Sequence, residues 1–397
     1  MAKPDETACI AGTLRTEESP VPDATITVTS PSGEEQEVQT SETGKWSVEV
    51  NEPGEYTVVL DKESLPDDVV IGQGEITVDV ARLGVTQAAT LDVRTGSYSA
   101  ETSKVDELIQ STVNGLRLGL LLALASVGLS LIYGTTGLSN FAHAEQVTLG
   151  GILGYFLINQ HGLGLWIGGL LVVILCAFTG WFQDRILWQP LRRRGLGLTQ
   201  MMIVTIGLSL ALQYVYQYTV GARTVRVLQD NPSVREIGPV TITNQSIVAM
   251  LISVVVLAAV GYALLRTRVG RATRAVSDNP ALAAASGIDT DRVIRLVWTT
   301  AMGLAGLSGL LYALVTNGIK WDSGLQILLL LFAAVTLGGL GTAFGALVGA
   351  LIIGLVVELS PVLGMPGDFK YATALLILIL LLLVRPQGLL GKPQRVG

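Results

Sequence analysis

Cysteine and histidine are scarce in this chain of 397 residues, which contains two of each. Cys9 lies in a polar segment and Cys176 in an apolar run, so they are not expected to pair, and a disulfide-stapled fold is excluded. No cluster of Cys, His and carboxylates has the spacing of a metal site. No Ser, His and Asp set suggests a hydrolase. The sequence therefore predicts neither a metal centre nor a catalytic site.

A phosphate-binding loop is also missing. The motif G-x-x-x-x-G-K-[ST] occurs nowhere, and Gly391-Lys392 is followed by Pro393. We therefore expect that the chain neither hydrolyses ATP alone nor binds a cofactor of its own. Glycine is abundant instead, with 45 residues, many of them inside apolar runs, and this favours close helix packing over phosphate binding.

Charged residues divide the chain into two parts. Residues 1–112 contain 7 Lys and Arg against 22 Asp and Glu, whereas residues 113–397 contain 19 against 10. The first part is typical of a small soluble acidic domain. The basic residues of the second part lie between apolar runs, where membrane topology explains them, so nucleic-acid binding is not expected.

Short runs of alternating polar and apolar residues predict an all-β sandwich in residues 1–95. The runs are 24–28, 46–50, 56–60 and 76–80. The order Pro20-Val21-Pro22-Asp23-Ala24, Thr43-Gly44-Lys45-Trp46 and Pro53-Gly54-Glu55-Tyr56 resembles carboxypeptidase regulatory-like, transthyretin-like modules. This resemblance implies a non-catalytic domain. Residues 96–112 are expected to form a polar linker.

Apolar runs near the ~20 residues that cross a bilayer predict a membrane domain over residues 113–397. The expected fold class is an all-α polytopic membrane protein, with about eight or nine transmembrane segments, behind the β-sandwich. The segments are 114–133, 141–159, 163–182, 199–220, 246–265, 293–315, 325–337, 345–359 and 371–384. Segments 325–337 and 345–359 are short, and we expect a hairpin of short or broken helices of the kind found at transport pathways.

Lys and Arg are concentrated on one side of this predicted domain. Loops 183–198 and 266–295 and the C-terminal tail carry thirteen, whereas the opposite loops carry five. The positive-inside rule therefore predicts that the first set faces the cytoplasm and that the β-domain lies outside the plasma membrane. Because Met1 to Pro22 contains no apolar run, we expect a signal segment that is removed or that precedes this sequence.

The segment 133–151, YGTTGLSNFAHAEQVTLGG, brings Asn140, His143, Glu145 and Thr148 within reach of the bilayer. Ionisable groups at that depth are costly and usually face a cavity or a partner. Two interpretations stay open: these side chains brace the start of a helix, or they line a substrate pathway. A proton relay is a third, although no second carboxylate is spaced to pass a proton on.

The polar segment 270–295, GRATRAVSDNPALAAASGIDTDRVIR, carries four arginines between two apolar runs. Small residues at helical spacing predict a helix over 272–286, followed by a turn at Gly287-Ile288. A loop this long, basic and regular suggests a docking surface for a partner.

The chain resembles the branched-chain amino acid ABC permease family, of the type that pairs with a second permease. The landmarks are Tyr133-Gly134, Gly137-Leu138, Asn140 to His143 and Glu145, with Ala144 in place of the usual glycine, then Gln189-Pro190-Leu191-Arg192, the loop from Gly270 to Val293, and the closing Pro386, Gly388 to Gly391 and Pro393. The resemblance implies a second permease, two P-loop ATPase subunits that use ATP, and an extracytoplasmic solute-binding protein. The ATPase-coupling residues that it implies are Gly270, Arg271, Arg274, Asp278, Ala283, Gly287, Ile288 and Arg292.

The implied substrate is a branched-chain amino acid, but permeases for urea, short amides or another amino acid share these landmarks. Two other classes stay open. One is a membrane-anchored sensor or binding protein, but a single span would anchor it, whereas this chain has about nine. The other is an ATP-independent carrier, but such a carrier has no need of a docking loop for an ATPase. The role of the acidic β-domain is left open.

Overall fold

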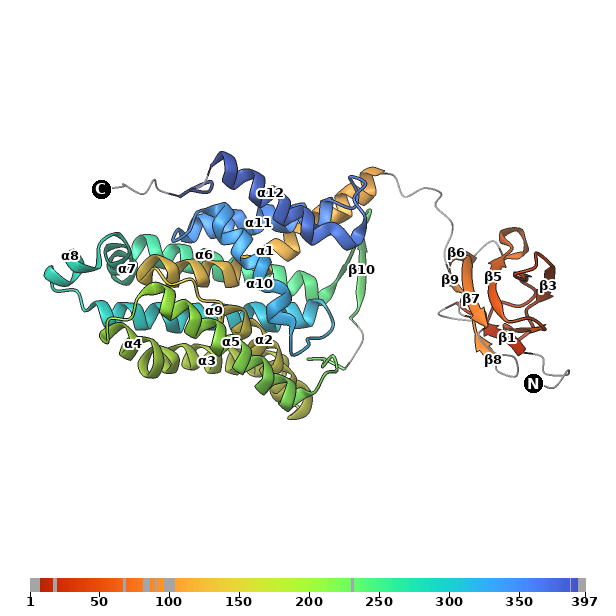
Figure 1. Ribbon diagram of the computed structural model, residues 1–397, viewed down its shortest axis with the longest axis horizontal. Coiled ribbons are helices and arrows are strands. Elements are labelled where there is room, and N and C mark those ends of the chain that lie inside the picture. The colour runs from red at the N-terminus through yellow and green to blue at the C-terminus, as the bar shows by residue number, and fades with distance from the viewer. Residues whose placement is uncertain are drawn as a thin grey trace. The chain divides into compact units, whose positions relative to one another are not determined.

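A computed structural model describes residues 8–16, 20–66, 69–80, 86–89, 91–95, 104–229, 232–385 and 387–391. It divides into two compact units, Met1–Thr102 and Ser103–Gly397 (Figure 1). The first long helix, α1, begins at Lys104, so it includes the second half of the stretch 96–112 that the sequence predicted as a linker. Pro386 and Pro393, two of the predicted landmarks, lie outside the described residues.

The first unit is built from β-strands. A four-stranded sheet has the order β3-β2-β5-β7, a three-stranded sheet the order β4-β1-β8, and β6 pairs with β9. The pairings are antiparallel except that of β1 with β8. The strands are β1 Ala8–Thr13, β2 Thr25–Thr29, β3 Glu35–Gln39, β4 Lys45–Val50, β5 Gly54–Leu60, β6 Val69–Gln73, β7 Glu75–Val80, β8 Thr86–Ala88 and β9 Asp92–Thr95.

One hydrophobic core joins the sheets of this unit. Trp46, Val48 and Val50 alternate with exposed residues along β4, and they share a cluster with Ile26 and Val58 of the other sheet. Period-two burial on facing strands is the pattern of a sandwich. The four predicted strands correspond to β2, β4, β5 and β7. The other five strands, β1, β3, β6, β8 and β9, were not predicted, and β3 in particular has no apolar face in its sequence EQEVQ.

The second unit is helical. Its elements are α1 Lys104–Thr136, α2 His143–Gly154, the π-helical turn η2 Tyr155–Gln160, α3 Leu165–Gln183, the π-helical turn η3 Asp184–Trp188, α4 Gln189–Arg193, α5 Leu198–Val220, β10 Val234–Ile237, β11 Val240–Thr243, α6 Asn244–Arg266, α7 Arg268–Asp278, α8 Pro280–Ala285, α9 Thr290–Val315, α10 Ser323–Gly338, α11 Ala343–Leu359 and α12 Lys370–Val384. Among the described residues, five helices are long and apolar enough to cross a membrane, and α10, α11 and α12 are shorter apolar helices.

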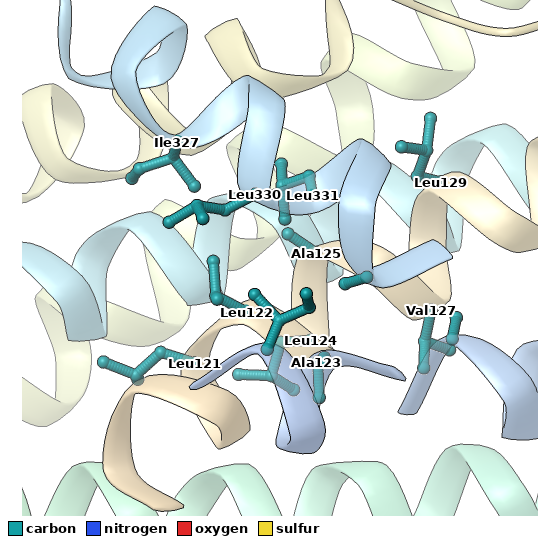
Figure 2. Close-up of a cluster of buried hydrophobic side chains, with 14 of the residues drawn as sticks. Leu121, Leu122, Ala123, Leu124, Ala125, Val127, Leu129, Ile327, Leu330 and Leu331 are labelled. Carbon is teal, nitrogen blue, oxygen red and sulfur yellow. The ribbon is translucent and has the colours of Figure 1, made fainter. Parts of the chain in front are cut away.

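The helix α1 is the centre of this bundle. Its residues from Gly119 to Ser130 are buried without interruption, and Figure 2 shows its leucines beside Ile327, Leu330 and Leu331 of α10. On another side, a Cβ atom placed on Gly354 of α11 would lie 2.4 Å from the backbone nitrogen of Gly119. Glycine at this contact therefore lets α1 and α11 pack backbone against backbone.

Burial separates central from peripheral helices. Of the most apolar stretches of α1 and α9, 78% and 72% of residues are buried, against 22% for the α3 segment and for α5 and 17% for α6. A helix that is apolar all round and buried belongs to the core, whereas an apolar face left exposed suits lipid or another membrane subunit.

One sequence prediction about the connections needs correction. The helix predicted over 272–286 is two helices, α7 and α8, because Pro280 disfavours helical geometry at Asn279, which has extended backbone angles of φ −158° and ψ 99°. The sequence analysis also did not predict the hairpin of β10 and β11. Figure 1 shows this hairpin at the end of the bundle opposite to α7 and α8.

Candidate functional site

The helix α2 begins inside the bundle. The ring Nε2 of His143, its first residue, lies 2.9 Å from the carbonyl oxygen of Ala125, near the middle of α1. Just before it, the backbone N–H of Phe141 donates to Thr205 of α5 at 3.2 Å, and that of Ala142 donates to the side chain of Asn140 at 3.1 Å. The chain from Gly137 to Ala142 therefore enters the bundle before it becomes helical.

The start of α10 meets α2 at the same place. The backbone N–H of Gly324 donates to the hydroxyl of Thr148 at 2.8 Å. A Cβ atom on Gly324 would lie 2.5 Å from the carbonyl oxygen of Ala144, so only glycine fits there. Two helix N-termini, each with a partial positive charge, thus lie together in the interior, an arrangement that attracts anionic groups.

A polar face of α5 holds Glu145. Its Oε1 accepts hydrogen bonds from the hydroxyl of Ser209 at 3.1 Å and the amide of Gln213 at 2.8 Å, and the hydroxyl of Tyr216 donates to its backbone oxygen at 3.1 Å. Ser209, Gln213 and Tyr216 follow one another at helical spacing, so they share one face. These three residues were not predicted from the sequence, although polar residues at helical spacing inside an apolar span are a usable signal.

The four residues predicted for the pathway are brought together and sealed from solvent. Asn140, His143, Glu145 and Thr148 are each 0% exposed. Most of their bonds hold helix starts to α1, α5 and α10, which fits the interpretation that they brace a helix start. Among the described residues, Nδ1 of His143, Oε2 of Glu145 and Nδ2 of Asn140 have no hydrogen-bond partner.

An open cavity lies at another place in the bundle. Its volume is about 1200 Å³, and it is enclosed by the end of α1, the helix α7, the turn between α10 and α11, and residues near the C-terminus. Arg274 and Asp278 of the predicted coupling set line it. Its other polar lining includes Tyr133, Thr136, Thr273, Ser277, Thr342 and Gln387. Sequence reasoning did not predict this cavity.

The corner formed by α7 and α8 and the turn after it contain the predicted coupling residues except Arg292, which lies in the first turn of α9. Asn279 caps α8 by accepting from the backbone N–H of Leu282 at 3.0 Å, and Gly287 ends the corner with a φ of +82°, which favours glycine. Leu282 is 64% exposed on the short helix α8.

The coupling set divides into two groups. Gly270 and Ala283 are buried and Ile288 is half-buried, so they hold the corner in shape, whereas Arg271, Arg274, Asp278, Gly287 and Arg292 are exposed. The other arginine-rich loop, at α4, lies at the same end of the bundle as α8 (Figure 1).

Residues 111–384 match the protein family described as the branched-chain amino acid transport system permease component. The chain belongs to this family. It is 30% identical over 307 residues to the high-affinity branched-chain amino acid transport system permease protein LivH of Escherichia coli, a match that covers 72% of this chain and 96% of that protein. It is 28% identical over 305 residues to the corresponding BraD of Pseudomonas aeruginosa, with the same coverage. It is 24% identical over 317 residues to the permease protein LivM of Escherichia coli, and this match covers 72% of each chain. No solved structure matches the chain.

The membership confirms the resemblance found in the membrane unit. The chain is a multi-pass membrane permease of a branched-chain amino acid ABC transport system. Its role is transport and not catalysis, and as a permease it binds no cofactor itself. The family match begins at residue 111, after the β-domain, so the identity of that domain stays a prediction.

Proposed function

We propose that this permease forms half of the membrane pathway of an importer for branched-chain amino acids. Its partners in this proposal are a second homologous permease, two P-loop ATPase subunits and an extracytoplasmic solute-binding protein. The observation that carries the proposal is the corner at α8, where an exposed Leu282 lies on a short helix capped at both ends. A single exposed leucine is ordinary on a protein surface, so the support lies in its place on this capped corner, beside the exposed Arg271, Arg274 and Arg292.

The corner is also well connected to the interior. Asp289 caps α9 by accepting from the backbone N–H of Arg292 at 3.0 Å, only two residues after Gly287. The helix α9 packs against α2, where a Cβ atom on Gly309 would lie 1.7 Å from the carbonyl oxygen of Val147. A displacement of α8 by the ATPases therefore reaches α2 through packed helices, as alternating access requires.

The proposed pathway runs past the start of α2, along Asn140, His143, Glu145 and Thr148. Support comes from the unpartnered Nδ1 of His143 and Oε2 of Glu145, because buried polar atoms are costly unless another state of the protein gives them partners. The two helix starts supply positive partial charge for a solute carboxylate. In this proposal the cluster opens when α5 separates from α2.

We place the permease in the plasma membrane with α4, α7 and α8 in the cytoplasm. The support is the excess of Lys and Arg in these loops, thirteen against five on the opposite side. This orientation puts the N-terminal unit outside, as a carboxypeptidase regulatory-like module. Protection of that unit from protease in right-side-out cells would contradict the orientation.

The first test is purification of the tagged chain in mild detergent, with its partners identified by mass spectrometry. We expect two P-loop ATPases and a second permease. Uptake of radiolabelled leucine into cells then tests the substrate, and uptake of urea or acetamide instead would favour the related permeases for short amides.

The second test compares two substitutions, Gly287→Trp and Gly195→Trp. Both glycines have a positive φ, +82° and +71°, and neither has an atom within 4 Å of a Cβ position, so both variants carry similar backbone strain. We expect Gly287→Trp to abolish transport at unchanged expression, whereas Gly195→Trp retains it. Normal uptake by the Gly287 variant would refute the docking role of α8.

A further inference from the structure

A network of charged side chains joins the end of the third long helix to the beginning of α9. On one side are η3 and α4, which continue α3 as one helical rod from Leu165 to Arg193. On the other side are the first two turns of α9, which follows the corner of α7 and α8 directly. We call this network the clamp, and its members are Asp184, Gln189, Arg192, Arg193, Asp291 and Arg295.

The buried half of the clamp is centred on Asp184, whose side chain is fully buried. Arg192 donates to its Oδ1 at 2.8 Å, and Nε of Arg295 lies 3.5 Å from its Oδ2. The side chains of these two arginines are only 18% and 22% exposed. The bond from Arg192 lies within the rod and fixes the buried carboxylate, whereas the contact that crosses to α9 is the ion pair with Arg295. Opposite charges away from water attract each other strongly, so this pair favours keeping the two helices together.

The outer half is centred on Asp291, four residues after Gly287. Its Oδ2 accepts from the amide of Gln189 at 2.8 Å and from Arg193 at 2.9 Å. The two halves are linked because Arg295 donates to the side-chain oxygen of Gln189 at 2.8 Å. Each side of the clamp thus supplies groups to both centres.

An aromatic contact supports the clamp. The rings of Trp188 and Trp298 stack with centroids 5.2 Å apart and an interplanar angle of 21°. Both rings are 0% exposed. Deeper along the same pair of helices, a Cβ atom on Gly180 would lie 2.4 Å from the carbonyl oxygen of Trp298, so α3 and α9 continue in close contact.

We infer that the clamp makes α3–α4 and α8–α9 move as one body, so that the ATPase stroke received at α8 drives α3 as well as α9. This inference rests on the proposed function. An apolar contact alone would let one helix slide past the other, whereas the clamp fixes both rotation and translation at the point where the stroke enters. The rod from Leu165 to Arg193 then carries the displacement across the membrane. The clamp members are positioning residues, since the clamp acts through the helices that it joins.

The test uses the complete transporter in proteoliposomes with its solute-binding protein. Leucine transported per ATP hydrolysed is measured for wild type, Arg193→Gln, Asp291→Asn and the charge-conserving Arg193→Lys. Arg193 is 67% exposed, so its replacement leaves the buried half intact. Arg194→Gln is the matched control, because it removes the same charge from the exposed neighbouring residue outside the clamp.

We expect the single variants Arg193→Gln and Asp291→Asn to assemble with the ATPases and to hydrolyse ATP, while leucine moved per ATP falls by about fivefold, the lower end of a typical coupling between sites. Arg193→Lys, which keeps the charge opposite Asp291, retains the ratio, and so does Arg194→Gln. A wild-type ratio in both single variants would overturn the inference. Loss of the ATPase subunits from both single variants would also overturn the inference, because the clamp would then be part of the ATPase-docking surface. If wild type itself recovers no ATPase, the proposed function fails instead.

Discussion

The contact between α2 and α9 gives the sharpest prediction about stability. A methyl group on Gly309 would lie 1.7 Å from the carbonyl oxygen, 2.6 Å from the carbonyl carbon and 3.0 Å from the Cα of Val147. All three are backbone atoms, so no side chain can turn away. Gly309→Ala therefore requires α2 to move away from α9 by more than an ångström.

That movement would break the bonds that hold the start of α2. The contacts from His143 to Ala125, Gln213 to Glu145 and Gly324 to Thr148 are 2.8–2.9 Å long and do not survive such a shift. Hydrogen bonds between membrane helices contribute about 0.6 kcal/mol each, and their loss adds about 2 kcal/mol. Overpacking itself costs about 1–3 kcal/mol. We expect a total destabilisation of about 3–5 kcal/mol, which corresponds to roughly 10 °C in the unfolding midpoint of a domain of this size.

The assay is thermal unfolding of the detergent-purified chain, followed by tryptophan fluorescence. The control is Gly207→Ala on α5, an exposed helical glycine with no atom within 4 Å of its Cβ position. Its midpoint should stay the same or rise, because alanine favours the helix by about 1 kcal/mol. Equal midpoints for the two variants would refute the close approach of α2 and α9.

Three further predictions follow from single contacts. Gln213→Leu leaves the buried carboxyl group of Glu145 with Ser209 as the remaining donor to Oε1, so it should lower the free energy of unfolding by about 1–3 kcal/mol and reduce leucine uptake. The control Gln217→Leu replaces a half-buried glutamine one turn away and should change neither stability nor uptake. Equal behaviour of the two variants would contradict the contact between Gln213 and Glu145. Gln110→Leu removes both bonds that join α1 to Thr241, at 3.1 and 2.7 Å, so hydrogen exchange should rise in 234–243 while the unfolding midpoint stays constant. Maleimide should label the half-buried Cys9 of the native protein and spare Cys176, which is 0% exposed, until denaturant is added; rapid labelling at Cys176 would mean that α3 does not pack on α9.

The apolar pattern predicts the helices of this protein closely where they lie in the membrane. The predicted segments 199–220, 246–265 and 371–384 end within two residues of α5, α6 and α12. The pattern misses the first turns of α1, because Asp106 and Glu107 interrupt the apolar run there, although Val105, Leu108 and Ile109 continue it at helical spacing.

The contacts of the candidate site could not be predicted in the same way. Glu145 meets Ser209 and Gln213 across 64 and 68 positions, and Gln189 meets Asp291 across 102. Single-residue properties identify a buried polar group but do not say which distant side chain satisfies it. The sequence therefore singled out polar residues that are buried in the helical unit, whereas the network around them required the fold.

The length of α1 has a mechanical consequence. Its 33 residues span about 50 Å at 1.5 Å per residue, whereas the hydrocarbon core of a bilayer is about 30 Å thick. About two fifths of the helix length, roughly 20 Å, therefore lies beyond the hydrocarbon if the helix stands upright in the bilayer. The same rod continues to the contact of Gly119 with Gly354 deep in the bundle. Because α1 has no break between Lys104 and this contact, a force or torque applied at residue 104 is transmitted to the core of the bundle. A partner that binds the N-terminal side of this permease could therefore displace the helices at its centre.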